Sequence, residues 1–211
     1  MRPMTPAEIT RMPEERRQRL ISEASREFAR AGYEHASLNR IIRACGMSKS
    51  SFYHFVESKQ ALFDLVLDGL RAAVGARIAV PSPEEFGGDR FWNTAERFLQ
   101  QLSELAQTDE SFAALGRMVY ASGVPSDAQA PIQAIFVAAE AWLEAVLGIG
   151  RRDGAIRSDI PAALQTRLVF SVLRTLDEWA VSQVGVLTPA DMRALVAAQG
   201  ALLRRMLQPD E

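Results

Sequence analysis

Apolar side chains recur at intervals of three and four residues through most of the chain, and no sustained alternation of apolar and polar residues is present. Residue types that favour helices, mainly Ala, Leu, Arg, Glu and Gln, fill the positions between them. The pattern therefore predicts an all-α fold. A first helix is expected over residues 13–31 with Gly32 as its stop, and its apolar face consists of Leu20, Ile21, Ala24 and Phe28.

Three further helices are expected in quick succession. Ser37 is a suitable N-cap for a short second helix that ends at Gly46. Ser48 is a suitable N-cap for a short third helix, and Ser58 for a longer fourth one. The apolar stripe of the second helix is Leu38, Ile41, Ile42 and Cys45.

Proline and glycine residues divide the remainder of the chain. The segment 81–88 predicts a join into a second helical region, and the segments 123–131, 148–161 and 185–189 are expected to separate later helices, the last running over 189–207. The glycines of 148–154 follow a helix rather than a strand, which favours a helix C-cap and turn over a phosphate-binding loop. The expected domains are a flexible arm (1–12), a helix-turn-helix domain (13–60), a connecting helix (61–80) and a larger helical domain (81–211).

Charge is distributed unevenly between the two ends. The net charge is -2, but residues 1–60 contain 11 Lys and Arg against 7 Asp and Glu, whereas the remainder contains 13 against 19. The basic end is the candidate surface for DNA. Arg2 and Arg11 favour either an arm that reaches a minor groove or a disordered terminus without contacts.

Other features bound the class of protein. The start of the chain has no signal-peptide core, and no run of about 18 uninterrupted apolar residues occurs, which predicts a cytoplasmic protein without a membrane partner. The single cysteine, Cys45, lies on an apolar stripe, so it is expected to be a core residue rather than a redox sensor. With two histidines and no catalytic or metal-ligand motif, neither an enzyme, a metal site nor a cofactor is expected.

The segment 37–59 is the part of the sequence that predicts chemistry. It contains a helix, a glycine turn and a second helix short enough to enter a major groove. Its outward positions are hydrogen-bond donors, which suit phosphate oxygens and the acceptor-rich edge of guanine. Lys59 opposes the dipole of the helix that it begins, which suggests an external anion such as a phosphate. The donors on the exposed faces are Arg40, Arg43, Lys49, Ser50, Ser51, Tyr53 and His54.

This segment resembles the N-terminal domain of the TetR family of bacterial transcription regulators. The resemblance rests on Ala31-Gly32, Ser37, the run 45–55 (CGMSKSSFYHF) and Ser58-Lys59, and it extends over about residues 14–66. It implies that Ser37, Tyr53 and Lys59 contact phosphates. Ser48 is expected to cap its helix beside a phosphate, and the residues facing the groove are Lys49, Ser50, Ser51 and His54. Two positions depart from the family pattern: Ser50, where glycine is common, and Val56-Glu57, which adds a carboxylate near the DNA backbone.

The last two helices are the expected dimer interface. The helix from Pro161 to Gly185 has apolar residues on two faces, and the final helix has small side chains that permit close helix approach. The family resemblance implies a four-helix interface at the same place, and a two-fold dimer would match a palindromic operator. The interface residues are predicted to be Leu164, Leu168, Val172, Leu176, Trp179, Leu195, Ala198 and Leu202.

The resemblance further implies a ligand-responsive repressor whose middle helices enclose a pocket for a small, mainly apolar effector that releases it from DNA. The alternative is a helical adaptor that binds proteins and does not bind specific DNA, and whose binding would be independent of Lys49, Tyr53 and Lys59. The candidate lining residues are Phe98, Leu102, Met118, Tyr120, Phe136, Glu140, Phe170, Arg174 and Asp177.

Overall fold

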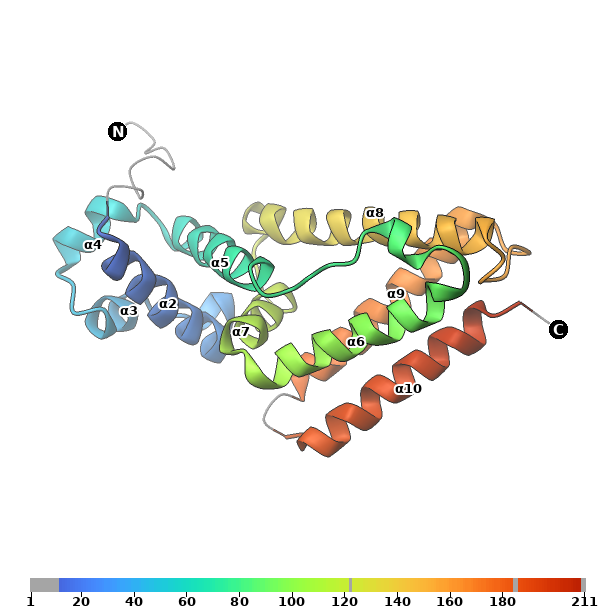
Figure 1. Cartoon of the computed structure of the whole chain (residues 1–211). Helices are drawn as coiled ribbons and strands as arrows, with labels where there is room; N and C mark the ends of the chain where they lie inside the picture. Colours follow the sequence, from blue (N-terminus) through green and yellow to red (C-terminus); the bar gives the residue numbers. More distant parts are fainter. Residues whose placement is uncertain (1–11, 122, 184–185, 210–211) are drawn as a thin grey trace. The chain divides into compact units, whose positions relative to one another are not determined.

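The computed structural model of the chain describes residues 12–121, 123–183 and 186–209, which are helical without strands (Figure 1). Most of the predicted N-terminal arm, with Arg2 and Arg11, and also Gly185 lie outside the described residues. The helices are α2 (Glu14–His35), α3 (Leu38–Ala44), α4 (Lys49–Phe55), α5 (Lys59–Gly75), α6 (Phe91–Thr108), α7 (Glu110–Val119), α8 (Ala130–Arg152), α9 (Ala162–Ser182) and α10 (Pro189–Leu207). Three short 3-10 turns are η1 (Pro83–Phe86), η2 (Gly88–Arg90) and η3 (Ser126–Ala128).

The chain forms two compact units. The first comprises residues up to Gly75 together with Ala114–Ile132, and the second comprises Ala76–Ala113 and Gln133–Glu211. In the first unit α2 packs against both α3 and α5. Gly32 leaves the helical conformation with φ 68°, as the sequence predicts, but a further helical turn continues to His35. The core of this unit includes the fully buried Leu20, Ala24, Phe28, Ile41, Phe52, Leu62 and Phe63.

The second unit is organised around aromatic side chains. Phe86 makes edge contacts with Phe91 and with Trp142, with ring centroids 5.8 and 5.7 Å apart. The Trp142 indole donates a 2.9 Å hydrogen bond to the Pro81 carbonyl, so the polar atom of this ring is satisfied. Helices α6 and α10 lie side by side (Figure 1). The 81–88 segment, with its two 3-10 turns, is thereby fixed to the core.

Two helix boundaries differ from the sequence-based predictions. The sequence did not predict the boundary between α6 and α7 at Asp109. There the Asp109 carboxylate accepts hydrogen bonds from the Ser111 and Phe112 N–H groups at the start of α7. The helix end predicted within 148–154 lies late in that segment, because α8 continues through Gly150 to Arg152. Gly150 lies in the helix where the Phe91 ring approaches so closely that a Cβ would be 2.5 Å from it. The left-handed glycine that follows α8 is Gly154, with φ 72°.

Among the described helices, α8 is long and apolar enough to cross a membrane by length and composition. Its side chains Leu143, Val146 and Leu147 are buried in the core of the second unit, and Glu140 and Glu144 interrupt its apolar run. Packing within the chain covers these three side chains, whereas 28% of the apolar stretch as a whole is buried.

Candidate nucleic-acid interface

The turn between α3 and α4 has a defined geometry. Gly46 takes φ 65°, a left-handed conformation that glycine adopts without steric cost. The Met47 N–H donates to the Ile42 carbonyl and the Gly46 N–H to the Arg43 carbonyl, so the last turn of α3 is closed. The Ser48 hydroxyl then accepts a 3.1 Å hydrogen bond from the Ser51 N–H, which confirms Ser48 as the N-cap of α4.

A buried carboxylate on α2 holds the start of α3. Glu27 is 6% exposed and accepts a 2.9 Å hydrogen bond from the Ser37 N–H, while Arg30 and Arg40 approach its oxygens to 2.9 and 3.6 Å. Burial alone would raise the pKa of Glu27, but the Ser37 N–H and the two guanidinium groups outweigh it and lower the pKa. The Ser37 side chain makes no capping hydrogen bond, so its hydroxyl stays available to another partner.

Sequence reasoning missed Glu27, although a signal was present. Glu27 follows Leu20 and Ala24 at helical spacing on the apolar face of α2, where a charged residue requires a partner.

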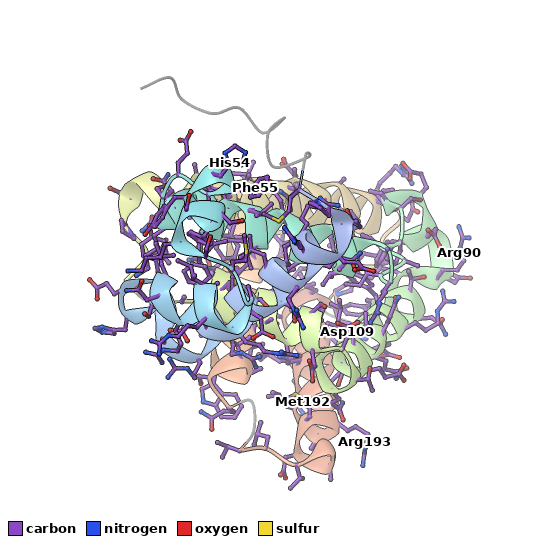
Figure 2. The ribbon with its side chains drawn as sticks, turned by 90° about the vertical axis from the view of Figure 1, so that its left-hand side faces the viewer. His54, Phe55, Arg90, Asp109, Met192 and Arg193 are labelled. Carbon is purple, nitrogen blue, oxygen red and sulfur yellow. The ribbon has the colours of Figure 1, made fainter. Side chains whose placement is uncertain are left out.

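The predicted groove-facing donors lie on the outside of α4. Lys49, Ser50, Tyr53 and His54 are exposed and Ser51 is half-buried. Figure 2 shows the His54 side chain at the surface, directed away from the ribbon. On the opposite side of this helix Phe52 is fully buried, so α4 is anchored by one aromatic side chain and presents its polar side chains outward.

Lys59 has an internal partner that the sequence did not indicate. Its ammonium donates a 2.8 Å hydrogen bond to the Glu34 carbonyl near the end of α2 and lies 5.2 Å from the centre of the Tyr33 ring. The carbonyl end of a helix and an aromatic face both favour a cation. These contacts remove the argument that Lys59 needs an external anion, although an ammonium has three donors and can bind a phosphate as well.

The first unit matches a known domain over most of its helices. Residues 20–66 match the family model described as bacterial regulatory proteins of the TetR family. This match identifies residues 20–66 as similar to the DNA-binding segment of that family.

A curated relative is similar over part of the chain, and solved structures are similar over most of it. An uncharacterized HTH-type transcriptional regulator, YdgC of Bacillus subtilis (strain 168), is 36% identical over 55 residues, which are 26% of this chain and 28% of the relative. The TetR-family regulator of Agrobacterium tumefaciens superposes with TM-score 0.67 and 16% identity over 93% of this chain and 100% of its own. The ketosteroid transcriptional regulator KstR2 of Mycobacterium tuberculosis gives TM-score 0.64 and 17% identity over 94% and 98%. The similarity to these structures shows a TetR-like all-α fold.

The residues predicted to line an effector pocket are divided between the two units. Met118 and Tyr120 belong to the first unit and the others to the second. In the second unit the structure brings three of them together: the Phe136 and Phe170 rings are 6.4 Å apart, and the Arg174 guanidinium lies 4.2 Å from the centre of the Phe136 ring. Phe98 packs instead against Trp142 of the core, with ring centroids 5.4 Å apart.

Asp177, another predicted lining residue, has an unusual environment. Burial raises its pKa to about 6, although solvent still reaches the side chain. Protein atoms therefore surround the carboxyl without closing over it. No group of three or more His, Cys, Asp or Glu side chains able to hold a metal ion occurs in the described parts of the chain.

The residues predicted for dimerisation are on α9 and α10. Leu164, Leu168 and Trp179 of α9 and Leu202 of α10 are exposed, with 44–48% of their surface open to solvent. The residues of α9 that are buried within the chain are Gln165, Thr166 and Val169. One largely apolar face of α9 is thus open in the single chain while a more polar face is packed.

Proposed function

We propose that this protein is a transcription regulator that binds a palindromic operator as a dimer. The observation that carries the proposal is the helix-turn-helix itself: a capped α4, anchored by Phe52, presents Lys49, Ser50 and His54 outward on a domain that matches the TetR family. A helix of seven residues with donors on its outer face suits the acceptor-rich edges of bases in a major groove. As a DNA-binding regulator it would act in the cytoplasm.

The DNA contacts divide by role. We assign Lys49, Ser50, Ser51 and His54 to the groove, and Ser37 and Tyr53 to backbone phosphates. The uncapped hydroxyl of Ser37 and the exposed ring of Tyr53 support this division. Ser48 is foremost the N-cap that sets the position of α4. Lys59 remains a phosphate contact in this proposal, with the ammonium shared between Glu34 and DNA.

The exposed apolar face of α9 and α10 supports dimerisation. Four apolar side chains of these helices are exposed in the single chain, and association would remove them from water. They are Leu164, Leu168, Trp179 and Leu202. A two-fold interface across these helices would present two copies of α4 to the two halves of an inverted repeat. Binding both half-sites at once raises affinity through the effective concentration of the second copy.

The second unit supports a small, mainly apolar effector with few polar anchors. Phe136 and Phe170 offer aromatic surface, and Arg174 and Asp177 offer charges of opposite sign beside it. The names of similar folds differ in ligand class, from a ketosteroid regulator to a fatty acid degradation regulator, so the fold alone does not select the effector. We propose repression by occupation of the operator, with release when the effector binds.

Selection of binding sites from a random DNA pool tests the proposal. The expected result is an enriched inverted repeat whose affinity falls steeply as salt rises, because a basic protein surface displaces counterions from the phosphates. The enriched site placed upstream of a reporter gene should lower expression when the protein is present, and a rise would contradict repression. Folded, dimeric and ligand-free protein that enriches no sequence would overturn the proposal in favour of an adaptor that binds proteins through the same apolar face.

A further inference from the structure

The arginines of α2 differ in their pairing. Each of three binds the glutamate three residues before it, at 2.7 Å for Arg17 and at 2.9 Å for Arg26 and Arg30. Arg16 and Arg19 are exposed and make no ion pair or hydrogen bond within the described residues. Their sequence context explains the difference, because the position three residues before Arg16 is Pro13 and the position three residues before Arg19 is Arg16 itself.

Both unpaired arginines line one hollow of the first unit. It has a volume of about 710 Å³, and Arg16 and Arg19 border it at adjacent turns of one face of α2. The helix-turn-helix supplies much of the lining, through the turn residues 45–48 and Ser51 at the start of α4. Glu15 also lines the hollow, so its side chains contribute two positive charges and one negative charge.

The polar groups of the hollow suit an anion. Ser48 uses its hydroxyl oxygen to accept the Ser51 N–H, which leaves its O–H free to donate. Two guanidinium groups three residues apart on a helix repel each other unless an anion lies near both. Guanidinium groups bind phosphate oxygens in pairs of parallel hydrogen bonds, so a single phosphodiester could engage both side chains.

We infer that Arg16 and Arg19 bind a backbone phosphate of the operator in this hollow. The inference rests on the proposed function and extends it to a helix outside the helix-turn-helix. A phosphate held between α2 and the start of α4 would fix the depth and angle at which α4 enters the groove, without itself reading sequence. The contact therefore concerns affinity for DNA in general rather than the choice of operator.

Charge-removing variants on one turn of α2 test the inference. With the selected operator as probe, R16Q and R19Q should each weaken binding about fivefold and the double variant about 20-fold, and should lower the slope of log affinity against log salt by about 1. R17Q is the matched control, because it removes the same charge on the same turn from a residue already paired with Glu14. It should change affinity less than twofold. Equal losses of operator affinity in R16Q, R19Q and R17Q would show that only the net charge of the protein matters, and would overturn the inference.

A second measurement distinguishes a DNA phosphate from a free anion. Operators carrying one uncharged methylphosphonate at successive positions should show a position at which wild type loses affinity and the R16Q/R19Q double variant loses nothing further. Inorganic phosphate titrated into the DNA-free protein should change the thermal midpoint of neither wild type nor the double variant. Saturable stabilisation of wild type alone, with no methylphosphonate effect, would assign the hollow to a free anion and overturn the inference.

The outcomes separate the two levels of the argument. If wild type binds an inverted repeat and the double variant, shown to be folded by circular dichroism, binds it equally well, the inference fails and the proposed function stands. If wild type binds no specific DNA, both fail together.

Discussion

The two units of this protein differ in what they leave on the surface. In the first unit, the exposed face of α4 consists of polar donors, and Tyr53 is the one large hydrophobic side chain that is prominently exposed among the described residues there. In the second unit, the large exposed hydrophobic side chains include Val80, Val137, Leu164, Leu168, Trp179, Val186 and Leu202. The same chain therefore offers a hydrogen-bonding surface at one place and an apolar surface at another.

The contrast corresponds to two kinds of partner. Binding to DNA depends on charge, hydrogen bonds and counterion release, for which exposed donors on a short, rigid helix suffice. Association of two protein copies depends on the removal of apolar surface from water. If this division is correct, a charge placed on α9 should damage assembly, and polar changes on α4 should damage DNA binding without changing assembly.

The largest effect is expected from charges on the apolar face. Leu164→Glu combined with Leu202→Glu places two carboxylates where the proposed dimer would bury them without partners. We expect a monomer by sedimentation velocity. Operator affinity should be lower by about 100-fold, because a monomer that binds one half-site no longer holds a second copy close to the other half-site.

The matched control is Val137→Glu on α8, where the valine is 65% exposed and outside the proposed interface. It should remain dimeric and bind the operator as wild type does. A double variant that stays dimeric at micromolar concentration would show that α9 and α10 do not form the interface.

The next effect concerns the residue that positions the polar surface. Glu27→Gln removes the charge that holds Arg30 and Arg40 and weakens the acceptor for the Ser37 N–H, so we expect a loss of about 2 kcal/mol in the free energy of unfolding. Urea denaturation measures it. Glu23→Gln, which breaks the more exposed pair with Arg26, is the control and should cost about 0.5 kcal/mol or less. Equal losses of unfolding free energy in the two variants would contradict the proposal that Glu27 holds the start of α3.

The stabilisation by Glu27 should also depend on pH in a defined direction. Its pKa is lowered in the folded protein from an unfolded value near 4.5. The stabilisation is then fully present above pH 4.5 and is lost as pH falls through the lower folded pKa. The difference between wild type and Glu27→Gln should therefore shrink only in strongly acidic solution.

A smaller effect is expected from a single phosphate contact. Tyr53→Phe keeps the ring that packs on Phe52 at 5.2 Å and removes only the hydroxyl. Operator affinity should fall about fivefold, equivalent to one hydrogen bond, with an unchanged thermal midpoint. Fluorescence anisotropy with labelled operator measures the first and circular dichroism the second. Unchanged affinity would place Tyr53 outside the DNA interface.

The sequence predicted the first unit in more detail than the second because local signals are dense there. Serine caps, the turn at Gly46 and apolar spacing are properties of a few neighbouring residues, and they led to α3, α4 and the start of α5. The pairing of Glu27 with the start of α3 joins residues ten positions apart, and the contact of Lys59 with Glu34 joins residues 25 apart. Such contacts depend on how helices pack, which the sequence pattern does not specify.

The errors in the second unit have the same origin. Glycines often end helices, so the glycines of 148–154 predicted a helix end there, but Gly150 lies within α8 because the Phe91 ring leaves no room for a Cβ at that position. The sequence assigned Leu164 and Leu168 to a face that a partner would cover, and both are exposed in the single chain, but it did not indicate that the polar side chains Gln165 and Thr166 would be packed inside. Which face of α9 is packed depends on the neighbouring helices.

The smallest effect is expected at Asp177 of α9, the carboxylate whose pKa burial raises most among those described in the second unit. Burial among protein atoms raises the pKa of Asp177 to about 6 from its ordinary value of 3.8, so the charged form is disfavoured in the folded state. The resulting loss of stability is absent below pH 3.8, develops between 3.8 and 6, and is complete above 6. Asp177→Asn should therefore raise the thermal midpoint slightly at pH 7.5 and have no such advantage at pH 4. Glu178→Gln removes the same charge from the adjacent exposed position and is the matched control for net charge. A midpoint for Asp177→Asn that follows wild type at every pH would mean that water solvates this carboxyl fully.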